Sequence, residues 1–152
     1  GRGAGAGLLS AFEFRHAWSL TADRARVFAV LADLGDYPSW WPQVRSVVRI
    51  DDDAAEVVVR SVLPYTLRLV LTREVEDEAN GLLRVGIGGD LCGWSQWVVR
   101  DDGPTVAEFT EEVEVAGALG AVARPGARLM RANHRAMMHG GERGLARHLG
   151  AD

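Results

Sequence analysis

The order in which the hydrophobic period changes along this chain restricts its fold more than any other feature. From residue 44 to residue 115 the apolar residues recur at every second position, which is the period of a β-strand. Turn sequences such as Asn80-Gly81 divide this stretch into six predicted strands, at 44–50, 55–63, 66–76, 82–88, 93–100 and 105–115. Connections this short favour an antiparallel meander over parallel strands with helical crossovers.

Further elements are predicted on both sides of this region. The segment 11–20 also alternates apolar and polar residues, which predicts a first strand. Thr21 is the expected N-cap of a short helix that follows it. The sequence DLGDYPSWWP at 33–42 contains two prolines, which favour a second, short helical turn over a long helix. The longest helical pattern covers about residues 125–149 and closes the chain.

The predicted C-terminal helix needs a large apolar surface on which to bury one face. The stripe that would be buried consists of Met130, Asn133, His134, Met137, Gly141, Leu145 and His148. The only apolar surface of sufficient size is the inner face of a curved sheet, so the fold class is α+β. Glycines in a helix cost about 1 kcal/mol each relative to alanine. We therefore expect a close approach to a strand or a ligand at Gly140, Gly141 and Gly144.

Length and composition indicate one globular domain over residues 11–149, preceded by a flexible segment of small residues at 1–10. No apolar run approaches the ~18 residues of a membrane span, and no signal peptide is recognisable, so we expect a cytoplasmic protein without stable membrane insertion. All 17 basic residues are arginines, which excludes lysine Schiff bases and a Walker-type phosphate lysine. The basic segment 116–152 lacks interleaved aromatic residues, which argues against nucleic-acid binding.

Three ionisable residues are predicted on the otherwise apolar inner face of the sheet: His16, Arg73 and Glu111. Strand alternation places them there beside the aromatic residues Phe14, Trp97 and Phe109. Burying an unpaired charge on an apolar face costs several kcal/mol, so each of these three residues should have a partner or a function.

Each of these residues has a catalytic interpretation and a structural one. His16 can act as a general acid or base oriented by Glu111, or it can be a core histidine bound to a backbone carbonyl. Arg73 can stabilise a developing enolate or alkoxide. Alternatively it forms an ion pair with Glu111 or extends to the rim. We do not expect a metal site, because His134 and His139 would lie about 140° apart around a helix.

The aromatic residues of the proline-rich segment are the next candidates for ligand contact. Tyr37, Trp40 and Trp41 are expected to form a lid or wall at the mouth of a cavity, where they could stack on a flat ligand. Plug packing of the same three side chains is the alternative.

Four sequence segments resemble the START/Bet v1-like (SRPBCC) superfamily, in particular its bacterial polyketide cyclase/dehydrase-like group. The segments are WSLTA at 18–22, VFAVLAD at 27–33, YPSWWP at 37–42 and GERGL at 141–145. The resemblance covers about residues 11–149. It implies a helix-grip fold, in which a seven-stranded antiparallel sheet wraps around the C-terminal helix, two short helices follow the first strand, and the first strand pairs with the last.

The resemblance also implies an elongated cavity and sets the functional expectations. Cyclase members fold a poly-β-keto chain there and promote aldol closure and dehydration without metal or cofactor. Arg73 falls where such members carry a cavity arginine, whereas Val44 replaces a tyrosine that they often have. We therefore expect Arg73, His16 and Glu111 as catalytic residues. The expected ligand-binding residues are Tyr37, Trp40, Trp41, Trp97, Phe109, Phe14, Asn133 and Met137.

Two functions follow from this expectation, and both use the same cavity. The first is a cyclase/aromatase-like protein, monomer or homodimer, that binds a hydrophobic aromatic or polyketide-type molecule. The second is a non-catalytic carrier or sensor of a lipid, isoprenoid or quinone. A chaperone-like interaction module would instead require a large exposed apolar patch, which the alternation does not reveal.

Overall fold

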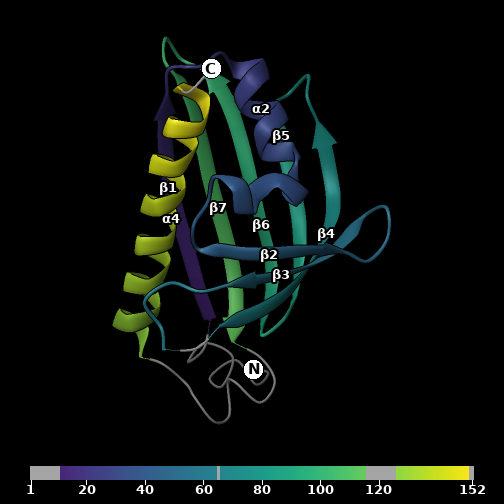
Figure 1. Ribbon diagram of the computed structural model, residues 1–152, viewed down its shortest axis with the longest axis vertical. Helices are drawn as coiled ribbons and strands as arrows, with labels where there is room; N and C mark the ends of the chain where they lie inside the picture. The colour runs from purple at the N-terminus through teal and green to yellow at the C-terminus, as the bar shows by residue number, and fades with distance from the viewer. Residues whose placement is uncertain (1–10, 65, 116–125, 151–152) are drawn as a thin grey trace, which may run out of the picture.

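The computed structural model describes residues 11–64, 66–115 and 126–150, and the segment 1–10 that we expect to be flexible lies outside these ranges. A seven-stranded antiparallel sheet has the order β1-β7-β6-β5-β4-β3-β2, so the first strand pairs with the last as expected. Figure 1 shows the sheet curving strongly, with the long C-terminal helix packed at its β1–β7 end.

The elements follow the predicted order closely. They are β1 Ala11–Leu20, α2 Arg24–Ala32, the 3-10 helix η1 Leu34–Ser39, β2 Val44–Arg49, β3 Ala54–Val59, β4 Leu67–Asp77, β5 Leu82–Gly89, β6 Leu91–Asp101, β7 Thr105–Val115 and α4 Ala127–Gly150. This arrangement is the helix-grip fold, and the expected class is confirmed.

Most boundaries lie within two residues of the prediction, and hydrogen bonds explain two of the differences. The N-cap of α2 is Asp23 rather than Thr21, because the Asp23 carboxylate accepts a hydrogen bond from the Arg26 amide at 2.9 Å. Strand β3 ends at Val59 instead of residue 63. The next amide, that of Arg60, still donates to the Gln43 carbonyl beside β2, but the pairing with β4 ends at Val59 and Leu67.

Two glycines of α4 allow that helix to approach the segment that follows η1. A Cβ added at Gly144 would lie 1.8 Å from the Trp40 carbonyl oxygen, and one at Gly141 would lie 2.5 Å from the Trp41 ring. The Trp41 Nε1–H donates to the Met137 carbonyl at 2.9 Å, which fixes the contact. The expected close approach is therefore made to the chain itself.

Candidate functional site

An internal cavity of about 540 Å³ lies between the sheet, η1 and α4. Apolar side chains from β1 to β7 form most of its wall. Seven of the eight residues expected to bind a ligand line it: Phe14, Tyr37, Trp41, Trp97, Phe109, Asn133 and Met137. A cavity of this size and character is typical of sites for small hydrophobic ligands.

The buried polar pair of this cavity is Glu111 of β7 and His134 of α4. Both line the cavity, and each residue is only 8% exposed. The His134 Nε2 lies 3.1 Å from the Glu111 Oε1, which is hydrogen-bond distance. Glu111 therefore faces inward as alternation predicts, but its partner is on the helix rather than on β1 or β4.

Two phenyl rings hold the His134 imidazole in one plane. The Phe14 ring stacks on it with centroids 3.8 Å apart and planes 6° apart. The Phe109 ring lies 5.8 Å away at 25°. These contacts leave the imidazole little freedom to rotate, so its two nitrogens keep their partners.

His16 contacts this pair from outside the cavity. Its Nε2 lies 3.3 Å from the His134 Nδ1, and the two rings are tilted by 33°. His16 is half-buried and does not line the cavity. Its contact with the cavity wall is the one that it makes with His134.

The surroundings of His16 disfavour its charged form. Burial lowers the pKa of His16 below the ordinary 6.5, His134 and Arg135 lower it further, and Glu111 acts in the opposite direction. Because the unfolded chain binds a proton at this residue before the folded protein does, protonation favours unfolding.

We expect the stability that His16 contributes to be present above pH 6.5 and lost as the pH falls through its lowered pKa. The free energy of unfolding, measured in urea, should therefore fall less between about pH 7.5 and about pH 5.5 in His16→Gln than in the wild type. His139→Gln, at an exposed position of α4, is the matched control and should follow the wild type. Equal declines in the His16→Gln variant and the wild type would contradict the argument.

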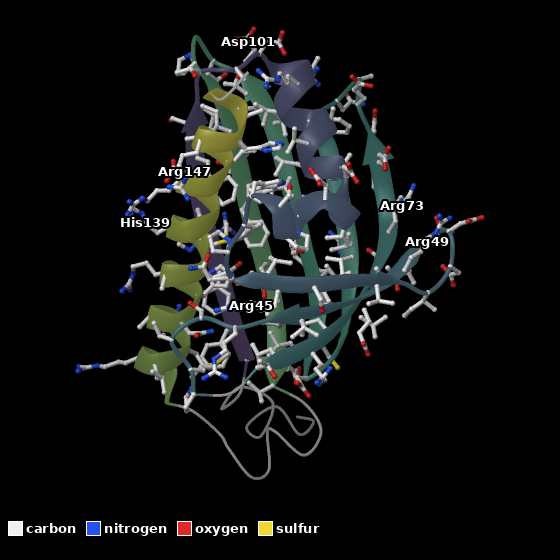
Figure 2. The ribbon with its side chains drawn as sticks, in the orientation of Figure 1. Arg45, Arg49, Arg73, Asp101, His139 and Arg147 are labelled. Atoms are coloured by element: carbon white, nitrogen blue, oxygen red, sulfur yellow. The ribbon has the colours of Figure 1, made fainter. Side chains whose placement is uncertain are left out.

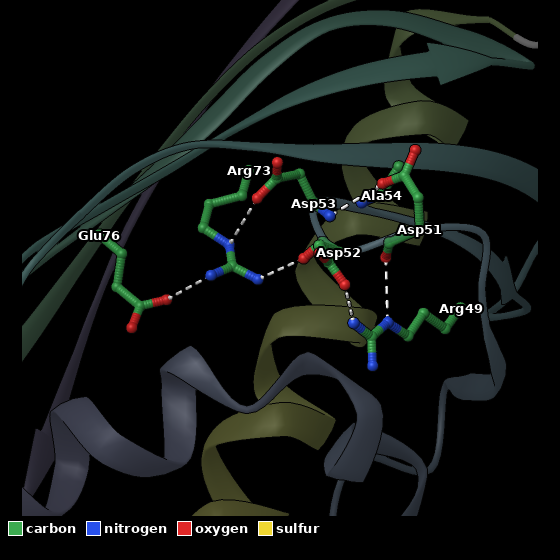
Figure 3. A network of polar contacts seen from close by, with 7 residues as sticks. All are labelled: Arg49, Asp51, Asp52, Asp53, Ala54, Arg73 and Glu76. Carbon is green, nitrogen blue, oxygen red and sulfur yellow. Dashed lines mark hydrogen bonds and ion pairs between the residues drawn. The ribbon is translucent and has the colours of Figure 1, made fainter.

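Arg73 belongs to a charged rim of the cavity, formed by Arg49, Asp51, Asp52, Asp53, Arg73 and Glu76. Its guanidinium donates to the Asp52 carbonyl at 2.9 Å and forms ion pairs with Asp53 at 3.9 Å and Glu76 at 3.5 Å (Figure 3). Among the described residues, no hydrogen bond or ion pair joins Arg73 to Glu111 or His16. Of the structural alternatives, extension to the rim is correct and an ion pair with Glu111 is not.

The position of Arg73 explains why it is exposed although it faces the cavity. Its side chain is 49% exposed, and a bulge interrupts the pairing of β4 with β5 just after it. Strands β5 and β6 separate β4 from the strand that carries Glu111. Figure 2 shows Arg73 and Arg49 on the side of the molecule away from His139 and Arg147 of α4.

The three aromatic residues of the proline-rich segment have different roles. Tyr37 donates its hydroxyl to the Leu31 carbonyl at 2.6 Å, and burial raises its pKa, so the hydroxyl is not free to protonate a ligand. Trp41 lines the cavity. Trp40 does not line the cavity: it packs edge-on against Trp18, and its carbonyl oxygen lies against Gly144.

Asn133 combines a place in the cavity wall with a structural bond. Its Oδ1 accepts a hydrogen bond from the Leu63 amide at 2.8 Å. This bond anchors the segment after β3 to α4. This bond uses one lone pair of Oδ1, which leaves the second lone pair and the Nδ2 group for a ligand.

His134 is the functional residue of this site that the sequence pattern does not identify. The helical period places it on the buried stripe with Asn133 and Met137, but strand alternation indicates partners for Glu111 on neighbouring strands only.

In the described part of the chain, no group of three or more His, Cys, Asp and Glu side chains could hold a metal ion. No described helix has the length and apolar character needed to cross a membrane.

Comparison with known families gives one match. A sequence model of the family described as "Polyketide cyclase / dehydrase and lipid transport" matches residues 11–150. A search of curated proteins finds no match to this chain.

Solved structures share the fold at low sequence identity. A protein from Thermus thermophilus has a TM-score of 0.72 at 21% identity, covering 93% of this chain and 99% of that chain. The Zhui aromatase/cyclase from a Streptomyces species has a TM-score of 0.71 at 15% identity, covering 90% and 92%. A START superfamily protein from Mycobacterium smegmatis has a TM-score of 0.64 at 13% identity, covering 90% and 94%. At these identities the likeness establishes the fold alone.

Proposed function

The chain belongs to the polyketide cyclase/dehydrase and lipid transport family, and we propose that it binds an aromatic or polyketide-type ketone in its cavity and transfers protons on that molecule. The observation that carries the proposal is the buried contact between Glu111 and His134 in a wall that is mostly apolar away from the charged rim. The apolar part of the cavity wall favours a hydrophobic ligand. The pair of Glu111 and His134 favours a ligand that exchanges a proton during its reaction.

Glu111 is the proposed base. Its Oε1 accepts a hydrogen bond from His134, which leaves Oε2 free to take a proton from a carbon next to a ketone. If that ketone carries a hydroxyl on the β-carbon, loss of the α-proton forms the C=C bond and breaks the C–OH bond. The departing hydroxide takes the proton from Glu111 and leaves as water. Glu111 is thereby regenerated and the atoms balance.

The same residues can support aldol closure. In this case the α-carbanion formed by proton loss attacks a second carbonyl of the same ligand molecule, and the resulting alkoxide recovers the proton from Glu111.

Arg73 would bind the outer polar end of the ligand at the charged rim, rather than the reacting carbon. Its donors are already shared with the turn that follows β2, so we propose a role in holding the rim.

A non-catalytic carrier of a lipid, isoprenoid or quinone is the second candidate. It is favoured by one observation: Tyr37, which lines the cavity, has its hydroxyl bound to the Leu31 carbonyl. Catalysed proton exchange on a bound ketone separates the two functions, because a carrier needs no proton transfer.

Binding to this cavity can be tested with the three methionines of the chain. Met130 and Met137 line the cavity, whereas Met138 is 1% exposed and lies outside its wall. With 13C-labelled methionine methyl groups, we expect added 2-tetralone, an aromatic ketone, to shift the Met130 and Met137 signals and leave Met138 nearly unchanged. No saturable shift, or a shift of Met138 alone, would count against ligand binding in the cavity.

A further inference from the structure

We infer that Glu111, His134 and His16 form a proton relay that connects the cavity with solvent beside α4. The use of this relay in turnover rests on the proposed function, but its existence does not. It assigns His16 the role of passing protons between solvent and His134. This role differs from contact with a ligand and from packing alone.

The relay rests on an unbroken series of contacts between titratable groups. The Glu111 Oε1 lies 3.1 Å from the His134 Nε2, and the His134 Nδ1 lies 3.3 Å from the His16 Nε2. Exposure increases along the series, because Glu111 and His134 are buried and His16 is half-buried. His16 is therefore the member of the series with the most access to solvent, and Nδ1 is its nitrogen that does not contact His134.

The hydrogen-bond roles give the relay two states. With Glu111 ionised, His134 donates from Nε2 to the carboxylate and must accept at Nδ1 from the His16 Nε2–H. When a proton reaches the His16 Nδ1, His16 passes its Nε2 proton to His134, and His134 passes its own to Glu111. The result is a protonated Glu111 and two neutral rings with their donors reversed, so the next transfer runs outward.

The surroundings of His16 suit a neutral ring that passes protons on. The charged and titratable groups acting on it are His134 and Arg135 of α4 and Glu111 of β7. Burial and the two groups of α4 disfavour a trapped imidazolium, and the direction of the His16 pKa shift is consistent with this. A histidine that only oriented His134 would need no access to water.

The relay would matter when the cavity is occupied. A ligand that fills the space between the charged rim and Glu111 separates the carboxyl group from water on that side. Protons can then reach Glu111 through His134 and His16, because His16 lies outside the cavity wall and is half-buried. The relay thus allows the proton taken from a ligand to exchange with solvent before it returns.

His16→Gln distinguishes a relay from a positioning contact. The glutamine amide can still donate a hydrogen bond to the His134 Nδ1, but it cannot pass a proton along. With 2-tetralone filling the cavity, so that water does not reach Glu111 from the rim side, we expect the His134 Nε2–H to exchange with water about tenfold more slowly in this variant, as measured by NMR. Arg15→Gln, on the outer face of β1, should exchange like the wild type. Equal rates in the His16→Gln variant and the wild type would overturn the relay.

Chemical rescue gives a second readout. Wild-type protein in D2O should incorporate deuterium into bound 2-tetralone, and His16→Ala should do so about tenfold more slowly while binding the ketone normally. Added imidazole should restore the rate, whereas pyrazole, a ring of the same size but a much weaker base, should not. Rescue by both rings equally would show that His16 only fills space and would overturn the relay.

The two experiments also separate this inference from the proposed function. If the wild type incorporates no deuterium above background, the proposed catalysis fails. The exchange of the His134 ring proton then still decides whether the relay exists. If the wild type incorporates deuterium and the His16 variants match it in both measurements, the relay fails and the proposed function stands.

Discussion

Replacement of Gly144 by alanine is expected to lower the free energy of unfolding by about 2 kcal/mol. The new Cβ would lie 1.8 Å from the Trp40 carbonyl oxygen, a backbone atom that cannot rotate away. Overpacking of this kind costs up to about 3 kcal/mol, and the better helix propensity of alanine offsets about 1 kcal/mol. Urea unfolding measures the difference directly.

The same substitution at Gly150 is the matched control. Nothing lies within 4 Å of a Cβ added there, at the end of the same helix. Gly150→Ala should therefore leave stability unchanged or raise it by a few tenths of a kcal/mol. If Gly144→Ala were as stable as Gly150→Ala, the close contact between α4 and the segment around Trp40 would be refuted.

Much of this fold could be predicted because its strands bury one face only. Alternation along 105–115 correctly places Ala107, Phe109 and Glu111 inward. A shift of one residue in this strand would turn its whole apolar set to solvent, so only one assignment of the faces is stable. Gly140, Gly141 and Gly144 of the last helix likewise indicate a close approach. The pattern does not show that the approach is to Trp40, Trp41 and Gln43, because that depends on tertiary packing.

The site was harder to predict than the fold. Alternation gives the face of a residue but not its distance along the strand from the cavity opening, so Arg73 was expected among buried groups and lies at the rim. The pairing of Glu111 with His134 joins β7 to α4 across 23 positions of sequence. No local pattern specifies such a contact; the buried stripe indicates only that His134 faces the sheet.

Glu111→Gln is expected to have the largest effect on activity. The amide preserves the shape of the side chain and can still accept from the His134 Nε2, but it cannot take a proton from a ligand. Loss of a general base typically slows a reaction by about 10²–10⁴-fold. Binding of a neutral ketone should change little, because the cavity wall remains intact.

The central claim is that the buried pair transfers protons on a ligand in the cavity, and deuterium incorporation into 2-tetralone tests it most directly. Mass spectrometry of the recovered ketone, corrected for uncatalysed exchange, compares the wild type with Glu111→Gln and with Glu112→Gln, an exposed neighbour on the same strand. The account predicts catalysed exchange in the wild type and in Glu112→Gln, and a rate near background in Glu111→Gln. Exchange at the wild-type rate in Glu111→Gln, or none in a wild type that binds the ketone, would contradict it.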